Sequence, residues 1–253
     1  MFDIKGKNAI VTGGSGDLGW SIVECYLSLG ARVIVIDINN NPLELGINKR
    51  TIEKYPKNFK FISADISDKS QIESSFSNAL SYFEGNVDIL VNSAGIQRRY
   101  SSEVFPEKDW DDVIAVNLTA TFLYSKLASQ IMVKHKSGKI INIASMQSFF
   151  GGVTIPAYAA SKGGVAQLTK AFSNDLSSRG INVNAIAPGY MDTKLNTALK
   201  NNPERFHETM LRIPMNRWGR PEDIAGLAVF LASKASDYIT GAIIPVDGGF
   251  SGR

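Results

Sequence analysis

The chain contains a single cysteine, Cys25, among its 253 residues. One cysteine excludes an internal disulfide, and its place in a helical pattern predicts a small apolar side chain rather than a reactive thiol. Histidine is also scarce, since only His135 and His207 occur. We assign neither histidine a catalytic role, and we expect no metal site.

The sequence also has little excess charge of either sign. The formal net charge is +3, and no basic run is longer than the pair Arg98 and Arg99. A nucleic-acid-binding surface concentrates far more positive charge than this. We therefore expect no nucleic-acid partner.

Long hydrophobic runs are absent as well. No apolar run reaches the length that crosses a membrane. A secretory leader begins with a positively charged segment, followed by an apolar stretch and a cleavage site. The first residues, MFDIKGKNAIVTGG, do not show this pattern. We expect a cytoplasmic protein with no membrane partner.

The sequence does contain short β-branched runs that alternate with longer helical patterns. This alternation predicts an α/β fold with a doubly wound, Rossmann-type, seven-stranded parallel sheet and helices on both faces. No linker or repeat interrupts it, so we expect a single domain over residues 1–253. The predicted strands are AIVT near 10, RVIVID ending at 37, FKFISAD at 65, VDILVN at 92, KIINIAS at 145, INVNAIAP at 188 and AIIPVD at 247.

One segment departs from the alternation. Residues 188–221 carry four prolines and many polar residues between the sixth strand and the last long helix. Long excursions of this kind in compact domains are usually functional lids. We therefore predict a substrate lid at about 188–221, over the carboxyl ends of the strands where ligands bind in such sheets.

The string TGGSGDLG, residues 12–19, lies at the first strand-to-helix turn. Glycines there let the backbone approach a phosphate, while the helix start supplies N–H donors and a favourable dipole. The turn predicts a dinucleotide site, although a glycine-rich turn also occurs where the chain merely bends tightly.

Asp37 strengthens this prediction, because it ends the second strand about 20 residues beyond the glycine turn. A carboxylate at this point accepts the ribose hydroxyls of NAD and repels the 2′-phosphate of NADP. Residues 12–20 and 37–41 contain no lysine or arginine that could bind such a phosphate. The sequence favours NAD(H) as cofactor.

Asp17 stands inside this turn, where a negative charge would oppose a diphosphate. In one interpretation the turn is degraded and binds the cofactor weakly. In the other, Asp17 caps the first helix with its side chain while its backbone and that of Leu18 face the phosphates. We favour the second interpretation.

The string YAASK, Tyr158 to Lys162, is the most specific motif. A spacing of four puts both side chains on one helix face, so the ammonium can lie beside the phenol. Holding a phenol as a base near pH 7 requires roughly 4 kcal/mol of phenolate stabilisation, which a neighbouring cation can supply. Ser145, at the end of the fifth strand, and Asn117, in the preceding helical pattern, accompany the pair.

Several residues and motifs together point to one known family: TGGSGDLG, Asp37, Asp65, the string NSAG at 92–95, Asn117, Ser145, YAASK and NVNAIAPGYMDT. With them, the chain resembles the short-chain dehydrogenase/reductase family over essentially its whole length. The family normally has NNAG where this chain has Ser93, and TGxxxGxG where it has Asp17. The resemblance implies hydride transfer between an alcohol or ketone carbon and the nicotinamide.

The resemblance also implies roles for individual residues. Tyr158 would be the general acid/base, Ser145 would hydrogen-bond the substrate oxygen, Lys162 would hold the nicotinamide ribose and lower the phenol pKa, and Asn117 would keep a proton-relaying water. The residues expected to contact the cofactor are Thr12, Gly13, Ser15, Asp17, Leu18, Asp37, Asp65, Ile66, Asn92, Ala94, Gly95, Tyr158, Lys162, Pro188, Gly189, Met191 and Thr193.

Within that family, the strings around AGIQRRY and the ending SDYITGAIIPVDGGF are similar to the sugar-acid branch. Arg98 and Arg99 follow the fourth strand, where a guanidinium can clamp a carboxylate bidentately. We expect one of them, Arg99, to face the cleft, with Gln147, Ser145 and Tyr158 completing the substrate site. Two solvated loop arginines and a polar loop filler at 147 remain the alternatives.

We therefore expect an NAD-dependent oxidoreductase acting on a sugar acid of the gluconate or deoxygluconate type. A neutral sugar or polyol dehydrogenase is the first alternative, and a 3-oxoacyl-carrier-protein reductase is a more distant one. A non-catalytic nucleotide-binding module would be expected to lack part of the Ser, Tyr, Lys and Asn set, which is complete here. The resemblance and the apolar ending AIIPVDGGF suggest a homotetramer.

Overall fold

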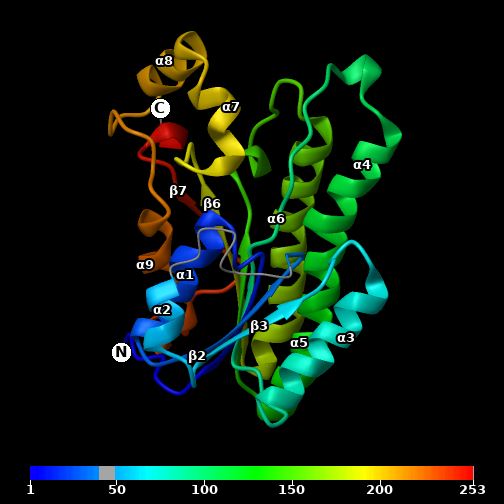
Figure 1. The fold of residues 1–253 in the computed structure, drawn as a ribbon, viewed down its shortest axis with the longest axis vertical. Helices are drawn as coiled ribbons and strands as arrows, with labels where there is room; N and C mark the ends of the chain where they lie inside the picture. The colour runs from blue at the N-terminus through cyan, green and yellow to red at the C-terminus, as the bar shows by residue number, and fades with distance from the viewer. Residues whose placement is uncertain (40–48, 253) are drawn as a thin grey trace.

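The computed structural model describes residues 1–39 and 49–252. Residues 40 and 41, part of the predicted cation-free segment after Asp37, lie outside this range, as does Arg253 at the end of the expected domain. The described part is built around one sheet of seven parallel strands, which confirms the predicted α/β fold (Figure 1). The strands are β1 Asn8–Thr12, β2 Arg32–Asp37, β3 Phe59–Ser63, β4 Ile89–Asn92, β5 Gly138–Ile143, β6 Ile181–Pro188 and β7 Ile243–Val246.

The strand order in the sheet is β3-β2-β1-β4-β5-β6-β7. The direction of winding therefore reverses between β1 and β4, which pair directly with Val11 opposite Val91. In open parallel sheets, ligands bind at the carboxyl edge beside such a reversal, because the loops leave the strands there in opposite directions. The topology thus puts the glycine turn after β1 and the NSAG segment after β4 at one edge.

Helices cover both faces of the sheet because each strand is followed by a crossover. In Figure 1, α1, α2 and α9 lie on one side and α3, α4, α5 and α6 on the other. The longer helices are α1 Asp17–Ser28, α3 Lys69–Tyr82, α4 Glu107–Ile114, α5 Ala120–His135, α6 Pro156–Leu176, α8 Pro203–Leu211 and α9 Glu222–Ala232; α2 Lys49–Lys54 and α7 Thr197–Lys200 are short.

Strand β1 shows how a parallel strand supplies two cores at once. All five of its residues are buried. Ala9 and Val11 belong to the core beneath α1 and α9, whereas Ile10 belongs to the core beneath α3 and α5. Successive side chains point to opposite faces. A near-continuous apolar run is therefore required, and each fully buried valine or isoleucine contributes about 1.5–3 kcal/mol.

Three strands end earlier than the sequence pattern predicts. β3 ends at Ser63 rather than at 65, β5 at Ile143 rather than at 145, and β7 at Val246 rather than at 247. In β5 the cause is local, because Ser145 begins a 3-10 turn, η4 Met146–Ser148, and its Oγ accepts the Gln147 N–H. The polar residues at these strand ends thus belong to the loops of the site.

The segment predicted as a lid folds into η6 Lys194–Asn196, α7 and α8. These elements lie at the top of the view in Figure 1, beyond the carboxyl ends of the strands and beside the C-terminus. Within the described residues, no helix is both long and apolar enough to cross a membrane.

Candidate active site

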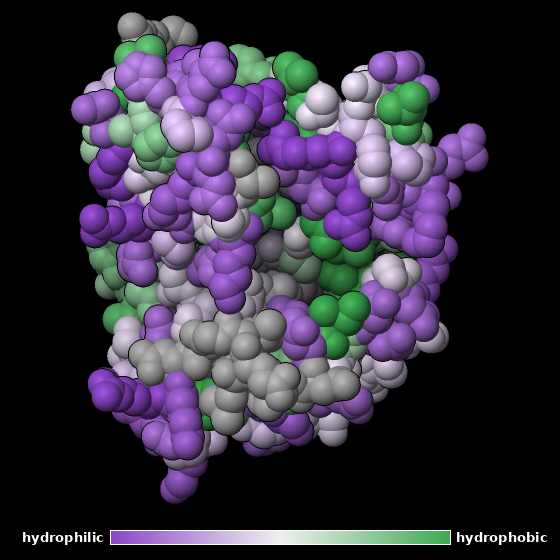
Figure 2. Space-filling model, turned by 45° about the horizontal axis from the view of Figure 1, so that its top comes forward, coloured by the Kyte–Doolittle hydropathy of each residue, from purple (hydrophilic) through white to green (hydrophobic). Residues whose placement is uncertain are grey.

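A cavity of about 780 Å³ opens at the carboxyl edge of the sheet. Its wall combines strand-end loops, the start of α6 and the lid. Figure 2 shows the hollow, with hydrophobic residues inside it and hydrophilic residues around its rim. Of the predicted site residues, its lining includes Leu18, Arg99, Ser145, Gln147, Tyr158, Pro188, Gly189, Met191 and Thr193.

Tyr158 and Lys162 come from the first two turns of α6, which starts with a proline at position 156. Proline suits the first helical position because its missing N–H would have no acceptor there. The Lys162 side chain is buried; its Nζ donates to the Ile143 carbonyl at 2.6 Å and lies 5.8 Å from the Tyr158 ring centre. The ammonium and the phenol therefore share one helix face, as the spacing predicts.

Burial dominates the protonation of both groups. It raises the pKa of Tyr158, an effect opposed by a side-chain hydrogen bond from Ser145 and by the charge of Arg99. It also lowers the pKa of Lys162 to about 8. Both shifts have one cause, since a site withdrawn from water disfavours the charged form of either group.

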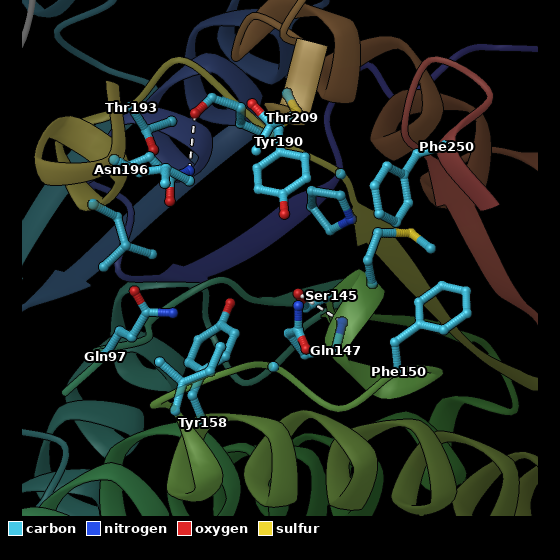
Figure 3. A pocket seen from close by; sticks show the side chains of 18 of the residues that line it. Gln97, Ser145, Gln147, Phe150, Tyr158, Tyr190, Thr193, Asn196, Thr209 and Phe250 are labelled. Atoms are coloured by element: carbon cyan, nitrogen blue, oxygen red, sulfur yellow. Dashed lines mark hydrogen bonds between the residues drawn. The ribbon is translucent and has the colours of Figure 1, made fainter. Parts of the chain in front are cut away.

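Ser145 lies beside Tyr158 because its loop is tied to α6. The Ser148 Oγ donates to the Lys162 carbonyl at 2.7 Å and accepts the Ser145 N–H at 3.3 Å. Ser145 Oγ accepts the Gln147 N–H, so its own proton is directed toward Tyr158 and the cavity. In Figure 3 Ser145 and Gln147 stand at the cavity beside Tyr158.

Asn117 is fully buried within a π-helical turn, Ala115–Thr119, between α4 and α5. Such turns occur frequently at functional sites, because the extra residue redirects backbone groups. Its amide accepts the Ile96 N–H at 2.8 Å and donates to the Ile96 carbonyl and to Ser161 Oγ, both at 3.0 Å. Asn117 therefore fixes the NSAG segment against α6.

The glycine turn packs directly on that segment. Gly13 has φ +63°, and a Cβ on it would lie 2.4 Å from Ala94 Cα, so only glycine fits. Helix α1 begins after Gly16, which has no side chain to cap the first N–H groups, and Ser15 Oγ is buried without a hydrogen-bond partner among the described residues. These free donors fit the diphosphate of a dinucleotide.

Asp37 is joined to this turn. Its Oδ2 accepts the Ser15 N–H at 3.1 Å, while its Oδ1 accepts the Ile38 N–H at 2.8 Å and the Asn39 amide at 3.3 Å. The carboxylate is only half-buried and lies at the end of β2, one strand from the turn. Asp37 therefore lies directly beside the glycine turn.

Other predicted cofactor residues differ in where their side chains lie. Asp65 and Ile66 are half-buried at the edge beyond β3, where Asp65 Oδ1 accepts from Ser67. The Asn92 amide instead donates into the core, to Ser125 Oγ and Asn142 Oδ1. Thr12 is buried at the end of β1. Gly95 lies close to Lys162, because a Cβ there would be 3.6 Å from Lys162 Nζ.

The interpretation of Asp17 as the cap of α1 is wrong. The capping position is Gly16, and Asp17 is the first residue of the helix. Its Oδ2 accepts the backbone N–H of Lys194, 2.7 Å away in the lid. Because Asp17 is one residue further along than a cap, its carboxylate points outward and holds the lid instead of the helix end.

The two adjacent arginines have different surroundings. Arg98 lies outside the cavity lining; its Nε is 3.5 Å from Asp109 and its Nη1 donates to the Gln97 carbonyl. Arg99 lines the cavity, and the Tyr158 and Tyr190 hydroxyls lie near enough to influence its pKa. Gln147 lines it too, with a buried Oε1 that has no hydrogen-bond partner.

Sequence reasoning missed several lining residues. Tyr190 faces Tyr158 across the cavity in Figure 3, and its ring meets that of Phe250 at 5.6 Å. Tyr190 lies inside the quoted string APGYM and could have been found there, whereas no local pattern connects Phe250 at the chain end to the site. Glu208 on α8 also lines the cavity.

The chain is similar to known proteins over almost its whole length. Residues 14–251 match the sequence model of a family described as enoyl-(acyl carrier protein) reductase. The chain is 43% identical over 253 residues to the 2-dehydro-3-deoxy-D-gluconate 5-dehydrogenase of Bacillus subtilis, a match that covers 100% of this chain and 97% of the relative. It is 41% identical over 254 residues to the 5-keto-D-gluconate 5-reductase of Escherichia coli K12, covering 98% and 97%.

A solved structure shares the fold. The crystal structure of a gluconate 5-dehydrogenase from Burkholderia cenocepacia, in complex with NADP and tartrate, gives a TM-score of 0.92 at 34% identity. The match covers 100% of this chain and 98% of that one.

The hydrogen bond from Lys194 to Asp17 predicts that Asp17 anchors the lid. Asp17→Ala removes a charged acceptor, whose bond contributes about 1.5–3 kcal/mol. We expect trypsin to cleave the native variant at Lys194 and Lys200 roughly tenfold faster than the wild type. Asp111→Ala, an exposed aspartate on α4, is the control; equal cleavage rates in all three proteins would contradict the anchor.

The lowered pKa of Lys162 predicts a dependence of stability on pH. Between its folded value of about 8 and its ordinary value of 10.5, the unfolded chain binds more protons at this position. The free energy of unfolding should therefore rise with pH through this window. The comparison is made in a Tyr158→Phe background. Between pH 7.5 and 10.5, we expect the free energy of unfolding of the protein with Lys162 to rise by about 3 kcal/mol more than that of the Lys162→Met variant.

Urea unfolding followed by circular dichroism at several pH values measures this difference. The control is Lys134→Met in the same background, since Lys134 is exposed. Its free energy of unfolding should change with pH by the same amount as that of the background protein. If the free energies of unfolding with and without the Lys162→Met change differed by a constant amount across this pH range, the ammonium would not be desolvated.

Proposed function

The chain belongs to the short-chain dehydrogenase/reductase family, and on that premise we propose that it interconverts a secondary alcohol and a ketone on a sugar acid, with NAD(H) as the preferred cofactor. The observation that carries the proposal is the convergence of Tyr158, Ser145 and Arg99 on one cavity. This set combines a proton-transfer group with a cation suited to a carboxylate.

Tyr158 moves the proton in this account. In oxidation its phenolate oxygen accepts the proton of the substrate hydroxyl, and in reduction the phenol returns it. Ser145, whose Oγ has a proton free, donates a hydrogen bond to the same substrate oxygen. Lys162 and Arg99 are the nearby positive charges that favour the phenolate.

The cofactor would be held by this chain's own turns. The α1 N-terminus and Ser15 would bind the diphosphate, and Asp37 the adenosine ribose, while Asp65 and Ile66 would lie against the adenine. Ala94, Gly95 and Lys162 would adjoin the nicotinamide ribose, with the segment 188–193 beside the nicotinamide. When bound, the nicotinamide supplies the hydride acceptor or donor.

Asp37 is the reason to propose a preference for NAD(H). Its half-buried carboxylate would be about 3 Å from a ribose 2′-oxygen that it binds, and a phosphate there would place two negative charges together. The Burkholderia relative was crystallised with NADP, so the preference of this chain needs its own measurement.

The proposed substrate class is a sugar acid, with Arg99 and Gln147 as contacts. Arg99 has no partner for its guanidinium among the described residues, which supports an anionic substrate. The names of the relatives, gluconate derivatives, point the same way. A neutral polyol would leave the charge of Arg99 unmatched and is the second candidate.

We further propose that residues 1–253 act as one domain in a cytoplasmic homotetramer. The edge strand β7 supports an assembly, because Ile243, Ile244 and Val246 are only half-buried within one chain.

The proposal is tested by following NADH absorbance with purified protein and a panel of gluconate, 2-deoxygluconate, 2-dehydro-3-deoxygluconate and the polyol glucitol. We expect kcat/KM for at least one sugar acid to exceed that for glucitol by a factor of about 100. We also expect kcat/KM with NAD⁺ to exceed kcat/KM with NADP⁺ by at least about tenfold. Faster turnover of glucitol than of every acid would overturn the substrate class, and a preference for NADP⁺ would overturn the role of Asp37.

A further inference from the structure

Two unpaired guanidinium groups face the same cavity from different elements. Arg99 follows β4, while Arg205 stands on α8 in the lid. Neither side chain makes a hydrogen bond or an ion pair with any described residue. Other basic residues nearby do have carboxylate partners. Arg98 lies near Asp109, Lys200 donates to Asp192 at 2.6 Å, and Arg217 donates to Asp223 through two nitrogens.

The two groups oppose each other electrostatically. Withdrawal from water and then the charge of Arg205 lower the pKa of Arg99. The cavity lining holds three guanidinium groups, including that of Arg212, against one carboxylate, Glu208. Such an arrangement is unfavourable without a ligand and becomes favourable when an anion binds between the cations.

Helix α8 is packed so that one face points into the cavity. Arg205, Glu208 and Arg212 recur at helical spacing along that face. Trp218 holds this helix in place: its Nε1 donates to Oγ1 of Thr209, which also lines the cavity, at 3.0 Å, and its ring lies 5.0 Å from that of Phe206. Asn202 caps the helix by accepting the Arg205 N–H.

Arg212 is engaged elsewhere. Its guanidinium lies over the Phe250 ring at 4.4 Å, a cation–π contact near the chain end. Among the described residues that line the cavity, this leaves Arg205 as the lid cation whose side chain makes no hydrogen bond, ion pair or cation–π contact.

We propose that Arg205 is a specificity-determining residue that binds the substrate carboxylate together with Arg99. Arg99 approaches from the rigid sheet edge and Arg205 from the lid, so the carboxylate joins the lid to the sheet. This inference rests on the proposed sugar-acid substrate and adds the second half of its anion site. A neutral substrate would leave the two cations repelling each other across the cavity.

The test compares D-gluconate with D-gluconamide, its neutral counterpart, under saturating NAD⁺. Arg205→Met should raise the KM for gluconate about 10- to 100-fold, the loss of one charge-assisted bond, while kcat changes less than about threefold. The KM for gluconamide should change less than about twofold. Arg205→Lys, which keeps the charge, should recover part of the loss.

Matched variants separate this inference from the proposed function. Arg98→Met, which removes an equal charge outside the cavity, should leave both values near those of the wild type. Arg99→Met should resemble Arg205→Met, and the double variant should lose less than the product of the two single losses, because both groups bind one carboxylate.

If Arg99→Met impairs gluconate binding but Arg205→Met does not, the role of Arg205 is overturned while the proposed function stands. If the wild type binds gluconamide as well as gluconate, the sugar-acid proposal itself fails. Without ligand, the thermal midpoint of Arg205→Met should equal or exceed that of the wild type, since a repulsion is removed; a drop of several degrees would show a structural role instead.

Discussion

The site depends on a lysine ammonium held out of water. Lys162 is buried on α6, where the Ile143 carbonyl is its hydrogen-bond acceptor and Tyr158 its neighbour one turn away. The protein keeps this cation at a cost in stability, because burial disfavours its charged form. The same burial raises the pKa of Tyr158, and the Ser145 hydrogen bond and the charge of Arg99 oppose that rise.

The surrounding structure maintains that arrangement. Ser148 joins the β5 loop to α6, Asn117 fixes the segment after β4, and Gly13 lets the phosphate turn pack on that segment. Asp17 then extends the frame to the lid through the Lys194 N–H. The carboxylate that breaks the family's glycine pattern thus links the start of α1 to the lid.

Local pattern predicted the sheet and much of the site, because period, spacing and turn chemistry act over a few residues. The pairing of Tyr158 with Lys162 and the position of Ser145 followed from such rules. Contacts between distant segments could not be predicted, because they form only once the chain has folded. Asp17 accepts the Lys194 N–H, the rings of Phe250 and Tyr190 pack together, and the charge of Arg205 lowers the pKa of Arg99. The strands end at 63, 143 and 246, earlier than predicted, and the polar side chains of Asp65, Ser145 and Asp247 just beyond them accept N–H groups of their own loops.

In the mechanism that we propose, Tyr158 transfers the proton while the surrounding residues position it and adjust its pKa. The most direct measurement is kcat/KM for sugar-acid oxidation by Tyr158→Phe, beside its thermal midpoint and its affinity for NAD⁺. We expect a loss of at least about 1,000-fold in kcat/KM, with fold and cofactor binding retained. A variant that kept more than a tenth of the wild-type rate would contradict it.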